Sequence, residues 1–456
     1  MISFTSPEFI FRFLPIFMLI YCLVPSKARK YVLLLGSLVF YTFGEPIFVI
    51  LLIILTILNF VLANKGYKFR RTAPENEVLK ERKRYMLCAV VLDVTVLVLF
   101  KCLSAFVDNG LLPLGLSFYI FKMISYQIDT VRGDIVKRPS FIETATYFMM
   151  FPQITQGPIM RYEDGEFHKE KKPTAAAIEE GLRLFVIGFA MKTLLADRIG
   201  ILWNDLGMYG YQSISTPLAW LGAFAYSFEL YFDFWGYSLM SSGILVALGF
   251  EFVRNFDHPY AAESISDFYR RWHVTLGAFF RDYIYFPLGG SRCAKSRIAM
   301  NLAVVWLLTG FWHGNGINFI IWGAVLGLFI IAEKLFLGKY LKKIRGLSHL
   351  YVIFVIPLTW VVFAIKDIPS LLVYFGRLFP VIPTETVVNS GDFISYLSDY
   401  KWMFLAAIIL CIPKVSELYK KYEKSWVVTI LLTGLFWVSV YFSVSAAGNP
   451  FMYLNF

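Results

Sequence analysis

The sequence predicts an all-α polytopic membrane protein, and three observations support this prediction. The 456 residues are 58% hydrophobic, and the mean hydropathy is +0.61. Only 16% of the residues are charged, against about 25% in soluble globular domains. Apolar runs without formal charge recur at 47–63, 298–312 and 350–365. Because a bilayer offers no water to the backbone, such runs are expected to form helices that satisfy their own hydrogen bonds.

The apolar segments fill most of the chain. We expect about eleven transmembrane helices, with the other segments re-entrant or interfacial. We also expect one membrane-embedded domain over 1–456, with N-terminal helices at 1–107, a catalytic core at 108–337 and C-terminal helices at 338–456. The candidate segments are 8–25, 31–44, 46–64, 85–107, 111–131, 141–160, 180–200, 216–234, 236–250, 298–312, 315–337, 349–366, 370–382, 400–413 and 426–446.

The formal net charge of +11 is explained by topology. Basic residues gather in short loops, as at 26–30 and 65–84, and two apolar segments separate these two loops. By the positive-inside rule both loops are cytoplasmic, and the N- and C-termini then lie outside. The sequence therefore predicts a multi-pass protein of the inner or plasma membrane. We expect it to contact membrane lipid and to have no nucleic-acid partner.

Four charged residues lie inside apolar or aromatic runs: Lys122, Asp129, Glu229 and Asp233. Charge within a membrane segment is costly and is a hypothesis of function by default. Structural pairing and snorkelling are equally good explanations at this stage. The cysteines show no metal-ligand spacing, and GxSxG, Walker A and HExxH motifs are absent from the sequence. We therefore expect no bound metal and no bound cofactor.

Residues 267–292 predict an amphipathic helix that lies in the interface or bends into the protein. Apolar and aromatic residues recur there at helical spacing, and charges interrupt them too often for a spanning helix. Ser266 or Asp267 is expected to cap its start. His273 lies on this helix, and either a packing role or a chemical role is consistent with the pattern.

A second histidine, His313, falls at the junction of two apolar segments within 307–323. Glycines follow it, and a broken helix is tolerated in a membrane where it lines a cavity. Imidazole titrates near neutral pH and can take a proton from a hydroxyl nucleophile. A structural role remains the alternative for an isolated buried histidine.

Several motifs resemble the membrane-bound O-acyltransferase (MBOAT) family, and most closely its bacterial branch, which includes the membrane subunit of alginate O-acetylation. The combination of RRWH, RDYIYFPLGG and FWHG is the specific part of the resemblance. One departure is Leu239, where that branch often has Asp. The matching stretches are FPQITQGPIMRYED at 151–164, the segment 231–273, RDYIYFPLGGSR at 281–292, LLTGFWHGNGINFIIWG at 307–323 and NPFMYLNF at 449–456.

The resemblance implies helices around a central funnel or tunnel that meets near a histidine. By motif match this histidine is His313, and the family's second histidine matches His273. His313 would act as general base on an acceptor hydroxyl, and His273 would orient the donor or hold the charge of the intermediate. Substrate contacts are expected from Trp312, Asn315, Arg270, Arg281 and Asp282.

The implied reaction moves an acetyl group from a cytoplasmic thioester, acetyl-CoA or an acyl carrier protein, to a hydroxyl acceptor for polysaccharide O-acetylation. The resemblance also implies an extracytoplasmic SGNH-hydrolase-like protein that carries the acetyl group onward. D-alanyl transfer to teichoic acids is the alternative within the family. A transporter of envelope precursors is the alternative from another class, although the chain lacks the internal duplication of many transporters.

Overall fold

The computed structural model describes residues 3–68, 75–169, 171–380 and 388–445, and within these ranges it contains helices and no β-strand. The all-α prediction is confirmed. The terminal stretch 449–456 and the middle of the basic loop 65–84 lie outside the described residues.

The chain forms two compact units. Unit 1 contains Met1–Phe185 and Tyr237–Arg254, and unit 2 contains Val186–Gly236 and Asn255–Phe456. The subdivision expected at residues 107 and 337 stays a prediction. The helices that begin in unit 1 are η1 (Phe9–Phe13), α1 (Leu14–Leu23), α2 (Ser26–Gly44), α3 (Phe48–Lys68), α4 (Glu75–Phe106), η3 (Asn109–Leu111), α5 (Leu116–Arg132), α6 (Phe141–Met149), α7 (Phe151–Ile154) and α8 (Ala175–Ala190).

Unit 2 holds most of the remaining helices, and α10 runs from unit 2 into unit 1. Its elements are η4 (Met191–Ala196), α9 (Asp197–Tyr209), η5 (Tyr211–Ser213), α10 (Thr216–Ala247), η6 (Pro259–Ala261), α11 (Ile265–Arg271), α12 (Val274–Phe280), η7 (Arg281–Tyr285), α13 (Lys295–His313), α14 (Ile317–Ala332), η8 (Glu333–Leu337), α15 (Gly338–Leu341), α16 (Arg345–Ala364), α17 (Ile368–Leu378), α18 (Asp392–Cys411), α19 (Pro413–Tyr422) and α20 (Trp426–Ser445).

Six helical stretches within the described part of the chain are long and apolar enough to cross a membrane. This finding confirms a polytopic membrane protein, and the number of about eleven spans stays a prediction. The six stretches are Phe48–Lys65, Asn76–Phe106, Ile317–Leu341, Gly346–Ala364, Asp392–Cys411 and Trp426–Ser445.

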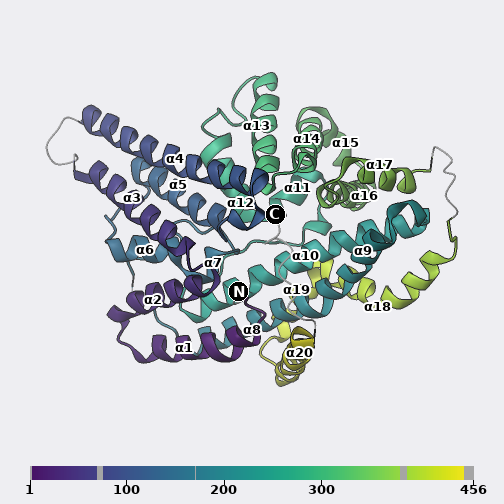
Figure 1. Cartoon of the computed structure of the whole chain (residues 1–456), viewed down its shortest axis with the longest axis horizontal. Coiled ribbons are helices and arrows are strands. Elements are labelled where there is room, and N and C mark those ends of the chain that lie inside the picture. Colours follow the sequence, from purple (N-terminus) through teal and green to yellow (C-terminus); the bar gives the residue numbers. More distant parts are fainter. Residues whose placement is uncertain (1–2, 69–74, 170, 381–387, 446–456) are drawn as a thin grey trace. The chain divides into compact units, whose positions relative to one another are not determined.

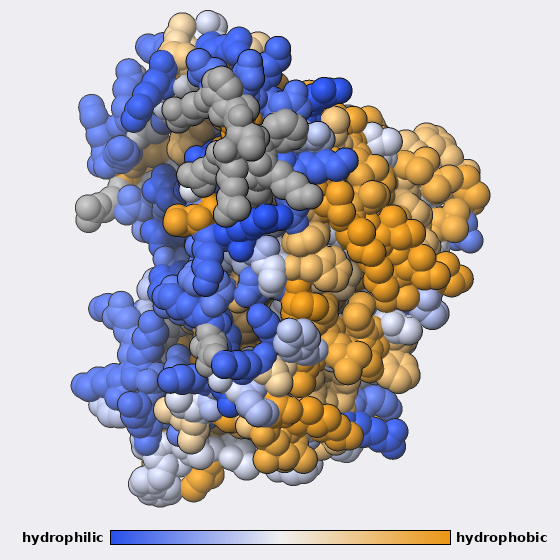
Figure 2. Space-filling model, turned by 90° about the vertical axis from the view of Figure 1, so that its left-hand side faces the viewer, coloured by the Kyte–Doolittle hydropathy of each residue, from blue (hydrophilic) through white to orange (hydrophobic). Residues whose placement is uncertain are grey.

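The surface separates by polarity. On the face drawn in Figure 2, hydrophobic and hydrophilic side chains gather in two distinct areas. In α3 and α4 the apolar side chains of Ile50, Ile54, Leu87 and Val91 point outward and are exposed. A soluble protein would bury many of these side chains, whereas a membrane protein can turn them toward lipid.

Polar side chains tie α3, α4 and α5 together, and these three helices lie side by side in unit 1 (Figure 1). Asn59 of α3 donates to Asp93 Oδ1 of α4 at 2.8 Å. Gln127 of α5 donates to Asn59 Oδ1 at 2.9 Å. Lys122 is also buried in this unit, and its ammonium donates to the Tyr147 carbonyl at 3.1 Å. Hydrogen bonds of this kind hold membrane helices together where lipid supplies no polar partner.

Unit 2 contains a buried ion cluster that accounts for one of the charges left open by the sequence. Lys192 Nζ lies 2.6 Å from a carboxylate oxygen of Asp197 and 2.6 Å from one of Asp233. These residues belong to η4, α9 and α10, so the cluster joins three elements of unit 2. The pairing favours a structural role for Asp233, because an unpaired buried charge would be far more costly than a paired one.

Helices α13 and α14 form a hairpin that crosses at two glycines. A Cβ atom at Gly323 would lie 2.4 Å from the Trp306 carbonyl oxygen and 3.1 Å from the Cα atom of Gly310. A Cβ at Gly310 would lie 2.4 Å from the Phe319 carbonyl oxygen. Small residues permit this close backbone approach in membrane helices. The crossing fixes the end of α13, which carries His313.

We expect Gly323→Ala to lower the free energy of unfolding by about 1–3 kcal/mol, because the added methyl group overpacks a backbone–backbone contact. Thermal unfolding of the purified full chain in detergent measures this change. The matched control is Gly434→Ala in α20, where a Cβ atom would meet nothing within 4 Å. Equal destabilisation by both substitutions would contradict the packing argument.

Candidate active site

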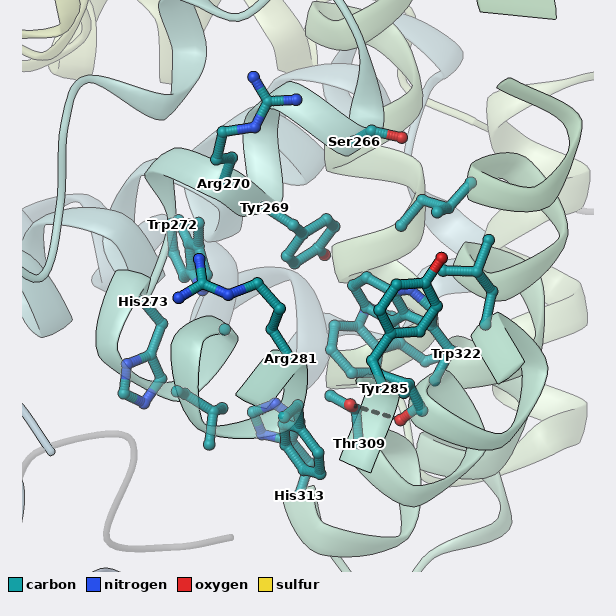
Figure 3. Close-up of a pocket in the computed structure, with 17 residues that line it drawn as sticks. Ser266, Tyr269, Arg270, Trp272, His273, Arg281, Tyr285, Thr309, His313 and Trp322 are labelled. Carbon is teal, nitrogen blue, oxygen red and sulfur yellow. Dashed lines mark hydrogen bonds between the residues drawn. The ribbon is translucent and has the colours of Figure 1, made fainter. Parts of the chain in front are cut away.

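A cavity of about 240 Å³ lies in unit 2 (Figure 3). Its walls come from α11, α12, η7, α13 and α14 and are mainly apolar and aromatic. Both histidines that the sequence singles out, His273 and His313, line it. Forty residues separate them in the sequence, so the folding of unit 2 brings them to one site.

The other predicted site residues divide into two groups. Arg270 and Arg281 line the cavity, whereas Trp312, Asp282 and Asn315 do not. Asn315 is exposed. Asp282 accepts two hydrogen bonds from the Arg281 guanidinium, at 2.7 and 3.0 Å, and so orients it.

Trp312 packs against the rings of both histidines. Its ring centroid lies 6.4 Å from that of His273 and 4.6 Å from that of His313. Trp312 is buried. Trp312 thus contacts the rings of both histidines, and its expected contact with substrate stays a prediction.

The prediction of a single amphipathic helix over 267–292 is wrong, because the helix is interrupted at His273. Helix α11 ends at Arg271, and α12 starts at Val274. Between them His273 adopts the left-handed conformation, with φ 45° and ψ 55°. This conformation is uncommon for a residue with a side chain and costs about 1–2 kcal/mol.

The expected start of this helix is also corrected. Ser264, and not Ser266 or Asp267, is the capping residue, and its side chain accepts from the Asp267 amide at 3.0 Å. Ser266 instead donates its amide to Glu333 at 2.8 Å, and the Ile265 amide donates to the same carboxylate at 2.7 Å. A carboxylate at a helix N-terminus is favourable because the free amides point toward it. Glu333 thereby anchors α11 to the end of α14.

Asn255 holds His273 in its strained conformation. The Asn255 carbonyl accepts from the Val274 amide at 2.9 Å. Its side-chain Oδ1 accepts from the Thr275 hydroxyl at 2.9 Å and from the Thr275 amide at 3.4 Å. The His273 Nδ1 lies 3.0 Å from this same oxygen.

These contacts determine the tautomer of His273. An amide N–H can only donate, so the Asn255 atom that faces Thr275 is an oxygen. Nδ1 of His273 must then donate to that oxygen, which leaves a lone pair on Nε2. Nε2 is buried and has no hydrogen-bond partner among the described residues. His273 therefore offers an unused acceptor in a residue that lines the cavity.

Burial keeps this imidazole neutral. His273 lies outside the six candidate spans, is 3% exposed and packs edge-to-face on Phe234, with 4.7 Å between ring centroids. Removal from water disfavours the charged form and lowers the pKa of His273 from its usual 6.5 to about 3. At neutral pH the ring is a hydrogen-bond acceptor at Nε2.

His313 lies at the last residue of α13 and is enclosed by aromatic rings. Its ring centroid lies 4.9 Å from that of Trp322 and 5.2 Å from that of Phe363, both nearly perpendicular to it. Trp322 also lines the cavity. Its buried indole N–H has no hydrogen-bond partner among the residues that the structure describes. Apolar walls of this kind exclude water and strengthen each polar interaction inside the site.

The sequence analysis missed three residues that shape the site: Asn255, Glu333 and Trp322. Asn255 precedes its partner His273 by eighteen positions, and Glu333 follows Ser266 by 67. The two residues of each pair lie in separate elements of the fold, so no local pattern could connect them. Trp322 lies within the motif stretch 307–323, yet its sequence gives no sign that its ring faces His313.

A comparison of His273→Gly with His273→Ala tests the backbone strain. Both variants lack the imidazole, but only glycine adopts a positive φ without steric cost. We expect the glycine variant to be more stable than the alanine variant by about 1 kcal/mol. Chemical or thermal unfolding of the two purified proteins provides the measurement. Indistinguishable stabilities would show that position 273 is not strained.

The chain is similar in sequence to one protein family and to several known proteins. The model of the MBOAT family, membrane-bound O-acyltransferase, matches residues 129–342. A probable alginate O-acetylase of Pseudomonas fluorescens is 35% identical over 381 residues, which cover 82% of this chain and 75% of that protein. A peptidoglycan O-acetyltransferase of Helicobacter pylori is 29% identical over 520 aligned positions, covering 99% and 97%. A teichoic acid D-alanyltransferase of Bacillus subtilis is 28% identical over 247 residues, covering 51% and 62%.

Proposed function

The chain belongs to the membrane-bound O-acyltransferase family. We propose that its cavity with two histidines transfers an acetyl group to a hydroxyl acceptor. The product is an O-acetylated polysaccharide of the cell envelope or the extracellular space. The observation that carries the proposal is the placement of His273 and His313 on one aromatic cavity. Family membership makes the chain an enzyme and leaves no reason to retain the transporter alternative.

Acetyl transfer is favoured over D-alanyl transfer by the extent of the relationships. The acetylating relatives align over 82% and 99% of the chain, whereas the D-alanyltransferase aligns over 51%. The apolar and aromatic walls of the cavity also suit a small uncharged acyl group better than an aminoacyl group, whose ammonium would need a buried partner. The alternative remains testable on the same samples.

In the proposed reaction His313 takes the proton of the acceptor hydroxyl, and the hydroxyl oxygen attacks the carbonyl carbon of the thioester. The carbon–sulfur bond then breaks, the ester forms, and the thiol leaves with a proton returned by His313. General base catalysis of this kind contributes about 10²–10⁴-fold. Donors for the negative charge on the carbonyl oxygen are the Trp322 indole N–H and the Arg281 guanidinium.

For His273 the geometry supports a role different from the one expected from the resemblance. A neutral ring with a lone pair on Nε2 accepts a hydrogen bond, and it cannot donate one from that atom to an oxyanion. We therefore assign His273 to accepting a hydrogen bond from another donor group of the bound acceptor, because the single proton of the attacking hydroxyl goes to His313. Asn255 is then the positioning residue of His273. This assignment needs no protonation of a group whose pKa is lowered to about 3.

The proposal also names the acyl donor, the partner protein and the orientation of the chain in the membrane. The donor is an acetyl thioester of coenzyme A or of a carrier protein, which reaches the enzyme from the cytoplasm. An extracytoplasmic SGNH-hydrolase-like protein receives the acetyl group and passes it on. The chain lies in the inner or plasma membrane with both termini outside, and the support is the distribution of Lys and Arg among its loops.

His313→Ala is expected to abolish acetylation, because the base is removed while the donor and acceptor still bind. The measurement is base-labile acetate released from envelope polymers of cells that carry the native chain, no chain or the variant at equal membrane abundance. His349→Ala is the matched control, since His349 bonds the Ala262 carbonyl and does not line the cavity.

Acetate that is present with the native chain, present with His349→Ala and absent with His313→Ala supports the proposal. Unchanged acetate in all four strains would refute acetylation. Ester-linked D-alanine, measured on the same polymers, would then decide whether the family alternative applies.

Substitution of Asn255 tests the positioning of His273. We expect Asn255→Ala to lower kcat by about 10–100-fold, as for other groups that orient a reactive histidine. In Asn255→Asp a carboxylate faces Nδ1 and raises the pKa of His273, so NMR titration of the His273 ring should show protonation at higher pH than in the native chain. An unmoved His273 titration in Asn255→Asp, or an unchanged kcat in Asn255→Ala, would contradict the assignment.

A further inference from the structure

A second cavity, of about 390 Å³, lies in unit 1. We call it the basic pocket. It is built by the start of α2 and by residues 167–169 and 171, about 140 positions later in the sequence, together with parts of α1 and α6. Among the described residues, five cationic side chains and one carboxylate, that of Glu143, line it. The five are Lys27, Arg29, Lys30, Lys169 and Lys171.

The one carboxylate is already engaged. Glu143 accepts from the Ser140 amide at 2.8 Å in a capping box at the start of α6. It also pairs with Lys30 at 3.4 Å. Glu143 therefore neutralises one of the five cations and serves the helix at the same time.

Three of the remaining cations keep their charge available. Lys27, Arg29 and Lys171 form no ion pair with any carboxylate in the described part of the chain, although Glu166 and Glu251 lie close enough to act on Lys171. Arg29 is held in place, since it donates to the Lys171 carbonyl at 2.7 Å and to the Tyr21 carbonyl at 3.3 Å. The Lys171 ammonium lies 4.7 Å from the centre of the Phe250 ring.

Membrane topology alone does not explain this arrangement. The positive-inside rule requires basic residues in a loop, but it does not require two distant loops to direct them into one cavity. The first turn of α2 is basic and has no acidic residue. Cations at a helix N-terminus oppose the helix dipole, so their placement there is unfavourable for the helix itself. An anion in the pocket would remove both the mutual repulsion and this cost.

An apolar stripe leads out of the pocket along α2. Tyr31 lines the pocket, and Leu35 and Val39 follow at intervals of four residues on the same face. All three side chains are exposed, at 54%, 64% and 40%. Lys27 precedes Tyr31 by the same interval. The face thus passes from a cation to an aromatic ring and then to apolar side chains, which is the order of a phospholipid from headgroup to acyl chain.

We propose that the basic pocket binds the phosphate ester of an anionic ligand, with the headgroup of an anionic phospholipid as the source that the apolar stripe favours. Lys27, Arg29 and Lys171 hold the phosphate, and the acyl chains lie along Tyr31, Leu35 and Val39. Basic pockets between membrane helices are suited to such headgroups. The site belongs to unit 1 and takes no part in the proposed acyl transfer.

The test measures lipid binding to the purified full chain in a neutral detergent by native mass spectrometry. The lipid probes are dioleoyl phosphatidylglycerol and dioleoyl phosphatidylcholine, and the soluble probes are glycerol 3-phosphate and coenzyme A. The pocket variant is Lys27→Gln with Lys171→Gln, which leaves Arg29 and its backbone hydrogen bonds intact. The matched control is Lys342→Gln with Lys343→Gln, two exposed lysines outside the pocket.

We expect phosphatidylglycerol to bind at least tenfold more tightly than phosphatidylcholine. The pocket variant should weaken phosphatidylglycerol binding roughly tenfold or more, at about 1 kcal/mol for each lysine, and the control variant should not. If the soluble phosphate esters bind in a way that depends on Lys27 and Lys171, and phosphatidylglycerol does not, the pocket is still a phosphate site. Its ligand is then a soluble phosphate ester and not a lipid headgroup. Equal binding of the two lipids without such soluble binding, or equal effects of the two variants, would overturn the proposal.

Discussion

The absence of water inside a membrane bundle is the constraint on which the rest of this structure depends. Every polar group away from the interface must find its partner within the protein. Asn59 and Gln127 meet between three helices of unit 1, and Lys192 meets two carboxylates in unit 2. Nε2 of His273 is one of several buried polar atoms without a partner among the described residues, and it differs in belonging to a residue that lines the cavity, where a ligand can supply the partner. The candidate site is recognised by this atom together with the cavity and the motifs.

The two histidines reach the cavity by different structural means. His313 ends a helix whose crossing with α14 is set by facing glycines, so helix packing determines its position. His273 interrupts a helix in a left-handed conformation, which Asn255 maintains through the backbone and the ring. Strain of this kind persists only when the surroundings over-determine it, and it is common at functional sites. One histidine is therefore placed by helix packing and the other by hydrogen bonds, and this difference suits two separate roles.

The net positive charge of the chain serves more than one purpose. Most basic loops are explained by topology, and the same loops set the orientation of the helices. The basic pocket differs because Arg29 and Lys171 are fixed by contacts with backbone and ring and line the same cavity despite their like charges. A phosphate ligand would make this arrangement favourable, and it would link the stability of unit 1 to the composition of the surrounding membrane.

The sequence by itself determined the all-α membrane class, the family and the two histidines, because apolar runs and short motifs are local properties of the chain. It could not determine that the helix expected over 267–292 breaks at His273, because the break depends on Asn255, eighteen residues earlier. The tautomer of His273, the contact of Trp312 with both histidine rings and the anchoring of α11 by Glu333 also required the tertiary structure. Each depends on a hydrogen bond or ring contact between separate elements, and no helical or strand period connects such partners in the sequence.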